Sequence, residues 1–221
     1  MTHPGPKPKK IVNETWTPKL AYAIGLLASD GCLLSRGHQI DLTSKDREQL
    51  ENFIKCLGLS AKIGKKKSGL GMSYLRVQFR SVLFYNFLTS IGLTPAKSKT
   101  IGVLKIPKKF FFDFLRGSFD GDGTIYSYWD PRWKSSFMFY LVFISASRKH
   151  IDWLRAEIAS TLGVRGHLNK DGRKIITQLK YAKKESLKIL AKMYPSKEVI
   201  CLSRKRLKIE LILDIVGEKL P

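Results

Sequence analysis

The residues best suited to chemistry in this sequence are two aspartates, Asp30 and Asp122, each followed directly by glycine. Each closes a segment of apolar and small residues, AIGLLASDG at 23–31 and LRGSFDGDG at 115–123. A single Asp-Gly pair is more often the end of a helix and a turn than a functional site. The same pair at matching positions of two similar segments favours a functional role.

Small residues recur every fourth position in both segments, at Ala21, Gly25 and Ser29 in the first and at Gly117 and Gly121 in the second. Residues four apart share one face of a helix, and small side chains on that face let two helix backbones approach closely. We therefore expect two helices packed side by side, with the two aspartates close together at their ends.

An aspartate at the C-terminus of a helix faces the negative end of the helix dipole, which costs about 0.3–1 kcal/mol. A positive group should therefore lie near each of these carboxylates. Two carboxylates beside the last free carbonyls of two helices also form an all-oxygen site. Such a site suits Mg²⁺, best of all when the phosphates of a substrate complete the shell.

The elements around the motifs indicate two copies of one unit. The helical pattern at 46–59 resembles that at 150–164, and the pattern at 74–93 resembles that at 175–194. Each copy is predicted to run helix, two strands, helix, two strands, helix. The second copy should have the longer first hairpin, because most of its extra length lies around residues 125–137, where Asp-Pro marks a turn.

We divide the chain into four parts on this pattern. Residues 1–13, rich in proline and lysine, are expected to form a flexible basic tail. The first unit is predicted at 14–100, a linker at 101–108 and the second unit at 109–221.

The composition points to a folded protein with a polyanionic partner. Among 221 residues, 40 Lys and Arg face 18 Asp and Glu, a net charge of +22, yet 43% are hydrophobic, which is too many for a disordered basic tail. No apolar run is long enough to span a bilayer or to act as a signal peptide, so we expect an intracellular protein, in the cytoplasm, the nucleoid or an organelle matrix, and not a secreted one. The three cysteines form no CxxC and indicate neither a disulfide framework nor a zinc site. Charge of this size favours nucleic acid over a membrane surface.

At residues 23–31 and 115–123 the sequence resembles the LAGLIDADG homing endonucleases, in their single-chain, two-motif, free-standing form. The stretch FLRGSFDGDGTI is the more specific match, whereas the first copy has Ala28 where the consensus has an earlier aspartate. The final aspartate of the consensus is present in both copies. The resemblance extends over about residues 16–210, nearly the whole chain.

The resemblance implies an α+β fold in which two pseudo-symmetric αββαββα units form a saddle. The antiparallel sheets would face double-stranded DNA, and the two motif helices would meet at the central interface. It implies a monomeric, intron-encoded DNA endonuclease that makes a staggered double-strand cut in a long asymmetric target. It also implies Mg²⁺ as cofactor, with Mn²⁺ able to replace it and Ca²⁺ able to support binding without cleavage.

The resemblance also assigns roles in the active site. Asp30 and Asp122 would coordinate metal and phosphate, helped by the backbone carbonyls of Ser29 and Gly121. A basic residue near each metal would come from the segment that follows each unit. The candidates there are Lys97 and Lys205, with Lys99 and Arg204 as neighbours, and Ser44 and Ser145 are candidates to hold a water.

Residues that would face DNA follow from the alternation of the strands. In YLRVQFR, Val77 and Phe79 should point inward while Arg76, Gln78 and Arg80 point outward. Arginine and glutamine in a major groove can read guanine and adenine, and the lysines at 65–67, at a hairpin tip, are expected to contact phosphates. The candidates of the first unit are Arg36, His38, Gln39, Asp41, Thr43, Lys65, Lys67, Arg76, Gln78 and Arg80. Those of the second unit are Tyr126, Tyr128, Arg132, Lys134, Lys170, Arg173, Lys174, Gln178 and Lys180.

Three other functions are compatible with parts of the sequence. An intron maturase, an RNA-binding splicing cofactor on the same fold, would have intron RNA as its partner, with or without DNA cleavage. A DNA-binding regulator without catalysis would lack a motif aspartate or carry an added helix-turn-helix, and neither is seen. A basic protein that coats nucleic acid would explain only the charge. The two intact aspartates favour the nuclease.

Overall fold

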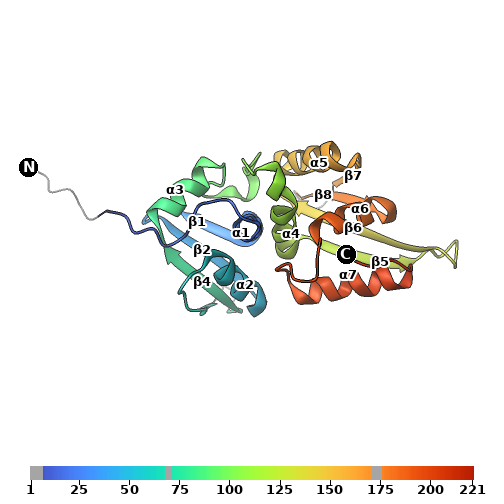
Figure 1. Ribbon diagram of the computed structural model, residues 1–221, viewed down its shortest axis with the longest axis horizontal. Coiled ribbons are helices and arrows are strands. Elements are labelled where there is room, and N and C mark those ends of the chain that lie inside the picture. Colours follow the sequence, from blue (N-terminus) through green and yellow to red (C-terminus); the bar gives the residue numbers. More distant parts are fainter. Residues whose placement is uncertain (1–6, 68–70, 171–175) are drawn as a thin grey trace, which may run out of the picture.

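Two similar halves lie side by side in the computed structural model, which describes residues 7–67, 71–170 and 176–221 (Figure 1). At the centre are the two motif helices, α1 (Pro18–Asp30) and α4 (Phe111–Asp122), which pack against each other. The halves therefore meet through the two segments that carry the Asp-Gly motifs, as the sequence predicted.

The first half contains one four-stranded antiparallel sheet and its helices. After α1 come β1 (Gly31–Leu34), β2 (Gln39–Ser44), α2 (Arg47–Leu57), β3 (Gly64–Lys67), β4 (Ser73–Arg80) and α3 (Val82–Ser90). The strand order is β1-β2-β4-β3. A short 3-10 turn, η1 (Lys97–Lys99), follows.

The second half repeats this order. After η2 (Lys108–Phe110) and α4 come β5 (Thr124–Trp129), β6 (Phe137–Ser145), α5 (Arg148–Leu162), β7 (His167–Lys170), β8 (Thr177–Ala182) and α6 (Lys183–Met193). The strand order β5-β6-β8-β7 matches that of the first sheet, and the first hairpin is the longer one, as expected. The predicted αββαββα fold is thus confirmed in both halves. An additional helix, α7 (Ser203–Ile215), which the repeat pattern did not predict, follows α6.

Local sequence explains where the main helices begin and end. Helix α1 has Pro18 at its first position, where no intrahelical N–H is needed, and the Thr17 hydroxyl accepts from the backbone N–H of Leu20. Helices α2 and α5 end at Gly58 and Gly163, which adopt left-handed φ angles of 63° and 67°. The Leu-Gly pairs that marked the repeat are therefore equivalent helix caps.

Glycine allows the close contact between α1 and α4. A Cβ built on Gly25 would lie 2.2 Å from the carbonyl oxygen of Phe114, and one built on Gly117 would lie 2.0 Å from that of Tyr22. Both are backbone atoms that cannot move aside without separating the helices. The predicted small-residue faces are thus the faces that meet.

Each sheet has one face against the helices and one turned away, which we call the open face. In the first sheet Ile40, Leu42 and Val77 are buried, whereas Arg76 and Gln78 on the other face are partly accessible. In the second sheet the inward residues include Leu179 and Tyr181, as predicted. No helix within the described ranges combines the length and the apolar character needed to cross a membrane.

Candidate functional site

The C-terminal ends of α1 and α4 bring the two motif aspartates together. A Cβ built on Gly121 would lie 1.9 Å from Ser29 Oγ and 3.0 Å from Asp30 Oδ2, so the ends of the two helices touch. Desolvation raises the pKa of both Asp30 and Asp122, and the charge of Asp122 raises that of Asp30 further. The two carboxylates are thus electrostatically coupled, as the helix packing predicted.

A buried lysine lies at the end of α1. Lys97 is 5% exposed, and its Nζ donates to the carbonyl oxygen of Ser29 at 3.1 Å. Burial lowers the pKa of Lys97, while the charges of Asp122 and Asp30 oppose that shift. Its ammonium supplies the positive charge that the helix end requires.

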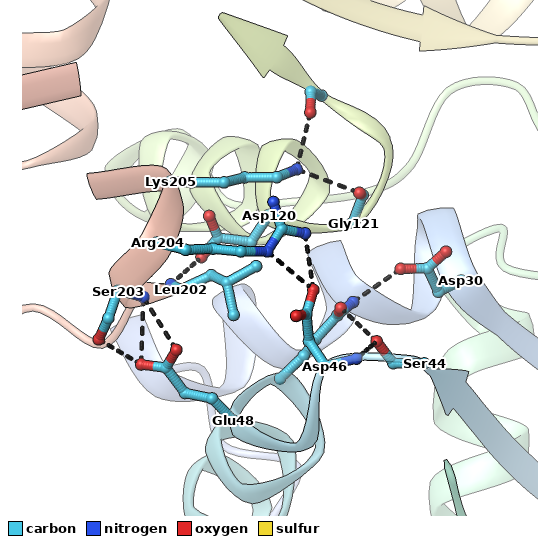
Figure 2. Close-up of polar contacts among 12 residues, drawn as sticks. Asp30, Ser44, Asp46, Glu48, Asp120, Gly121, Leu202, Ser203, Arg204 and Lys205 are labelled. Atoms are coloured by element: carbon cyan, nitrogen blue, oxygen red, sulfur yellow. Dashed lines mark hydrogen bonds and ion pairs between the residues drawn. The ribbon is translucent and has the colours of Figure 1, made fainter. Parts of the chain in front are cut away.

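An equivalent lysine lies at the end of α4 and comes from α7. Lys205 Nζ donates to the carbonyl oxygens of Gly121 at 3.2 Å (Figure 2) and of Gly123 at 2.7 Å, and also to that of Phe119. Lys205 is 8% exposed, and burial lowers its pKa to about 8. Because Ser29 and Gly121 precede the final aspartate of each motif, the two lysines donate to equivalent carbonyls. The neighbours differ: Lys99 is exposed, and Arg204 pairs with Asp46.

A glutamine that sequence reasoning did not select holds Asp30. Gln49 Nε2 donates to Asp30 Oδ2 at 2.7 Å, and Gln49 Oε1 accepts from Ser44 Oγ at 2.8 Å. Gln49 is 2% exposed. Its one signal in the sequence is a polar residue at a core position of α2, next to Leu50. Ser44 therefore supports Asp30 through Gln49.

The equivalent position in the second half is occupied by His150, which makes a different contact. Both Gln49 and His150 are the third residue of their helix. The Nδ1 of His150 lies 2.9 Å from the carbonyl oxygen of Gly102, and burial lowers the pKa of His150 to about 4. Ser145 Oγ accepts from the backbone N–H of Ser147 at 3.1 Å. The support of the two aspartates is therefore asymmetric.

Asp120, the earlier aspartate of the second motif, forms hydrogen bonds with residues of two other segments. Asp120 is fully buried, and its Oδ2 accepts from the Tyr22 hydroxyl of α1 and from the backbone N–H of Leu202, both at 2.8 Å. Burial raises the pKa of Asp120 to about 6. The corresponding residue of the first motif is Ala28, so this link occurs only at the second site.

The donor set of the site fits a hard divalent cation. Asp30 and Asp122 supply carboxylate oxygens, and Ser29 and Gly121 supply carbonyl oxygens, each of which retains a second lone pair beside its lysine. Within the described ranges no group of three or more His, Cys, Asp or Glu residues is placed to hold a metal by itself. Two carboxylates with the remaining positions left to water and substrate phosphate suit Mg²⁺.

Comparison with known proteins identifies the fold. No protein-family model matches the chain, and no curated protein matches it. Among solved structures, the homing endonuclease I-WcaI bound to its DNA recognition sequence matches with a TM-score of 0.61 and 15% identity, over 94% of this chain and 95% of that chain. The I-LtrWI LAGLIDADG homing endonuclease bound to target DNA matches with a TM-score of 0.59 and 13% identity, over 90% of this chain and 91% of that chain. The chain has the LAGLIDADG fold.

The same fold occurs in full-length DUF199/WhiA from Thermatoga maritima, with a TM-score of 0.57 and 14% identity. That match covers 94% of this chain, which spans 63% of the WhiA chain. Because homing endonucleases and WhiA share the LAGLIDADG fold, the fold alone does not select an activity.

In this LAGLIDADG fold, the first sheet carries its polar candidates on one open face. The register of β2 with β4 places Gln39, Asp41 and Thr43 opposite Arg80, Gln78 and Arg76. Asp41 is 4% exposed and pairs with Arg76 at 3.5 Å and Lys66 at 3.9 Å. The predicted outward set is therefore on the open face, with Asp41 already engaged by two cations.

Two lysine candidates of the first unit, Lys65 and Lys67, lie in strand β3. Strand β3 ends at Lys67 and forms a hairpin with β4, where Lys65 and Lys67 pair with Leu75 and Ser73, so strand alternation puts them on the helix side. Lys66, which pairs with Tyr74 and contacts Asp41, is the lysine of the open face. Lys65 and Lys67 are exposed, and their assignment as phosphate contacts stays a prediction; residues 68–70 lie outside the described ranges.

Two further candidates lie in the turn of the first hairpin, between β1 and β2. Arg36 is exposed there. His38 has a left-handed φ of 52°, and its ring packs edge-on against Tyr85 of α3, with centroids 5.1 Å apart. His38 is partly exposed beside this packing contact, and its assignment as a base contact stays a prediction.

The open face of the second sheet is aromatic rather than charged. Tyr126 and Tyr128 are both there and stack on Tyr140 with centroids 5.4 and 6.3 Å apart. Lys180 lies over the Tyr126 ring at 5.8 Å, and Gln178 is two residues away on the same face. Tyr140 was not among the predicted residues, although the alternation of β6 would have found it.

The remaining candidates of the second unit lie in loops or outside what the structure describes. Arg132 and Lys134 are exposed in the loop after β5, where Arg132 pairs with Asp130 at 3.2 Å. Lys170 ends β7, and its backbone pairs with Thr177. Arg173 and Lys174 lie outside the described residues.

Proposed function

We propose that this protein is a site-specific DNA endonuclease that makes a metal-dependent, staggered double-strand cut in a long asymmetric target. One observation carries the proposal: Asp30 and Asp122 meet at the ends of two packed helices, each with a buried lysine on the carbonyl that precedes it. The likeness to homing endonucleases bound to their DNA supports it. I-DmoI, which shares the fold, has been studied with DNA and Mn and with DNA and Ca.

In this proposal Asp30 and Asp122, with the carbonyls of Ser29 and Gly121, hold divalent cations of the Mg²⁺ type. When bound, such a cation activates a water and stabilises the leaving 3′ oxygen. Desolvation raises the pKa of both aspartates even though the charges of Lys97 and Lys205 oppose that shift, so a bound cation would stabilise the two carboxylates further.

Two lysines and a glutamine would stabilise the reacting phosphate and orient a carboxylate. Lys97 and Lys205 place fixed positive charges next to the carboxylates, where the extra negative charge of a phosphate in reaction would be stabilised. Gln49 holds the Asp30 carboxylate in one orientation through its bond to Oδ2. Each aspartate with its lysine would then serve one DNA strand.

The DNA would lie across the two open faces, one for each half of the target. The first face offers Arg76, Gln78 and Arg80, and the second offers tyrosines with Lys180. Since the faces differ in chemistry, a single chain would read two unlike half-sites as a monomer. The net charge of +22 adds affinity for the phosphate backbone.

Cleavage of a randomised duplex library in Mg²⁺ tests the proposal. Wild type is compared with Asp30→Asn, Asp122→Asn and the double variant, with binding followed in Ca²⁺ and the cut ends sequenced. Staggered cuts at one long site by wild type, with variants that bind but do not cut, support the proposal. Tight binding of a structured RNA without cleavage of any DNA would overturn it in favour of the maturase alternative.

A further inference from the structure

A set of polar contacts joins α2 of the first unit to the beginning of α7 of the second (Figure 2). Asp46 Oδ2 accepts from Arg204 Nη2 at 2.6 Å and from Arg204 Nε at 3.0 Å. The carboxylate of Glu48 accepts from the backbone N–H of Ser203 at 3.1 Å and from the Ser203 hydroxyl. We call these contacts of Asp46 and Glu48 with Ser203 and Arg204 the α2–α7 clamp.

The clamp holds the segment from which Lys205 extends. Helix α7 begins at Ser203, so its first backbone N–H groups have no partner within the helix. Glu48 satisfies the first of them and places a negative charge at the positive end of the helix dipole. Because Lys205 is in the same first turn, fixing Ser203 and Arg204 also fixes where the Lys205 side chain starts.

The turn of α2 that forms the clamp also supports Asp30. The backbone N–H of Asp46 donates to Ser44 Oγ at 3.0 Å, and Ser44 Oγ donates to Gln49 Oε1 at 2.8 Å. Gln49 then donates to Asp30 at 2.7 Å. A continuous polar chain therefore runs from Asp30 of the first motif to Arg204, next to the lysine of the second.

The opposite side of the molecule has the same crossed arrangement with uncharged groups. The Ser147 hydroxyl, at the start of α5, donates to the carbonyl oxygen of Ile101, and His150 Nδ1 lies 2.9 Å from the carbonyl oxygen of Gly102. These contacts hold the segment after Lys97 against α5 of the second unit. Each lysine segment is thus held by the second helix of the other unit. Among the contacts described on the two sides, the ion pair lies on the Lys205 side.

We propose that Asp46 and Glu48 are positioning residues that hold Lys205 in the second active site, so that the cut of one DNA strand depends on contacts supplied by the first unit. The inference rests on the proposed function. Its consequence is specific: a chain with a broken clamp still binds its target and cuts one strand, but it leaves the other strand intact. The double-strand cut becomes a nick.

The test uses the full chain and a supercoiled plasmid that carries the target, with each strand labelled separately. The variants are Asp46→Asn, Arg204→Met and Asp46→Asn with Glu48→Gln, and Lys205→Met identifies the strand that depends on Lys205. The matched control is Asp152→Asn, which removes an exposed ion pair with Arg148 on α5. Binding in Ca²⁺ and thermal unfolding are measured for each variant.

We expect the clamp variants to cut the Lys205-dependent strand at least about tenfold more slowly, since charged hydrogen bonds of this kind are lost. The other strand should change less than about twofold, and the control should match wild type. Asp46→Glu, which keeps the charge, should restore part of the lost rate. This strand difference separates positioning from a general loss of folding, which would slow both strands.

Equal slowing of both strands, or no slowing of either, would overturn the positioning role while leaving the endonuclease proposal intact. Slower cleavage of the strand that does not depend on Lys205, with normal cleavage of the other, would overturn it as well. A wild-type chain that cuts no DNA overturns the proposed function itself, and the two failures are therefore distinct.

Discussion

Gln49 donates its amide proton to Asp30 Oδ2 across 2.7 Å, and it does so from a position that is almost completely buried. The same amide accepts from Ser44 at 2.8 Å, so its donor and its acceptor are both used. A glutamine bound at both ends keeps the carboxylate beside it in one orientation. Asp122 receives no such support from the equivalent His150, which bonds to Gly102 instead.

This difference predicts that Gln49→Ala slows cleavage at the Asp30 site more than at the Asp122 site. The variant removes the buried amide that donates to Asp30 and accepts from Ser44, which costs about 1–3 kcal/mol. We expect slower cutting of the strand served by Asp30, with unchanged binding in Ca²⁺, measured by strand-labelled cleavage. Asn86→Ala, at an exposed amide on α3, is the control. Equal rates for Gln49→Ala and wild type would show that the bond does not orient the carboxylate for reaction.

The close approach of α1 and α4 leads to a second prediction, for stability. In Gly117→Ala the new Cβ would lie 2.0 Å from the carbonyl oxygen of Tyr22, and a backbone atom cannot rotate away. We expect the free energy of unfolding to fall by about 1–3 kcal/mol or more, as for other overpacked sites. Gly102→Ala is the matched control, because nothing lies within 4 Å of a Cβ there. Chemical denaturation of both variants measures the difference, and similar midpoints would contradict the packing argument.

The motif helices were predictable because their information is local. Small residues four apart, followed by Asp-Gly, define a face and an end within a dozen residues, and the repeat makes the pairing of α1 with α4 the natural arrangement. The need for a positive charge at each helix end followed from the dipole alone, and Lys97 and Lys205 lie at those ends.

The parts that were missed depend on contacts between distant residues or on register. Gln49 reaches Asp30 only because α2 packs on α1, and α7 is held through residues more than a hundred positions away. Which lysine of β3 shares the open face with Tyr74 depends on register, because a shift of one residue reverses the face of a strand. No local pattern in the sequence specifies these relationships.

Burial of His150 predicts a loss of stability in mild acid. Its ring lies among Phe114 and Trp153 with Lys97 as the nearby charge, and burial lowers its pKa from 6.5 to about 4. The folded state keeps His150 neutral, so its contribution is complete above pH 6.5 and declines as the pH falls through 6.5 toward 4, where only the unfolded chain binds the proton. The loss should be about 3 kcal/mol.

Urea unfolding of wild type and His150→Asn at pH 7 and pH 4.5 measures this contribution. The asparagine cannot take up a proton but can still donate to the Gly102 carbonyl. We expect the wild type to lose more stability than the variant between the two values. Parallel losses would assign the acid sensitivity to other groups.

The open face of the first sheet predicts how Arg76 contributes to recognition. Arg76 is held by Asp41 at 3.5 Å and is opposite Thr43, so its guanidinium is oriented before DNA binds. If it reads a base, Arg76→Ala should weaken binding in Ca²⁺ by about 1–3 kcal/mol and relax selectivity at one position of one half-site. Arg47→Ala, an exposed arginine of α2 paired with Glu51, should change neither. Uniform weakening across all sequences, with a smaller dependence on salt, would instead make Arg76 a phosphate contact, because counterion release carries no sequence information.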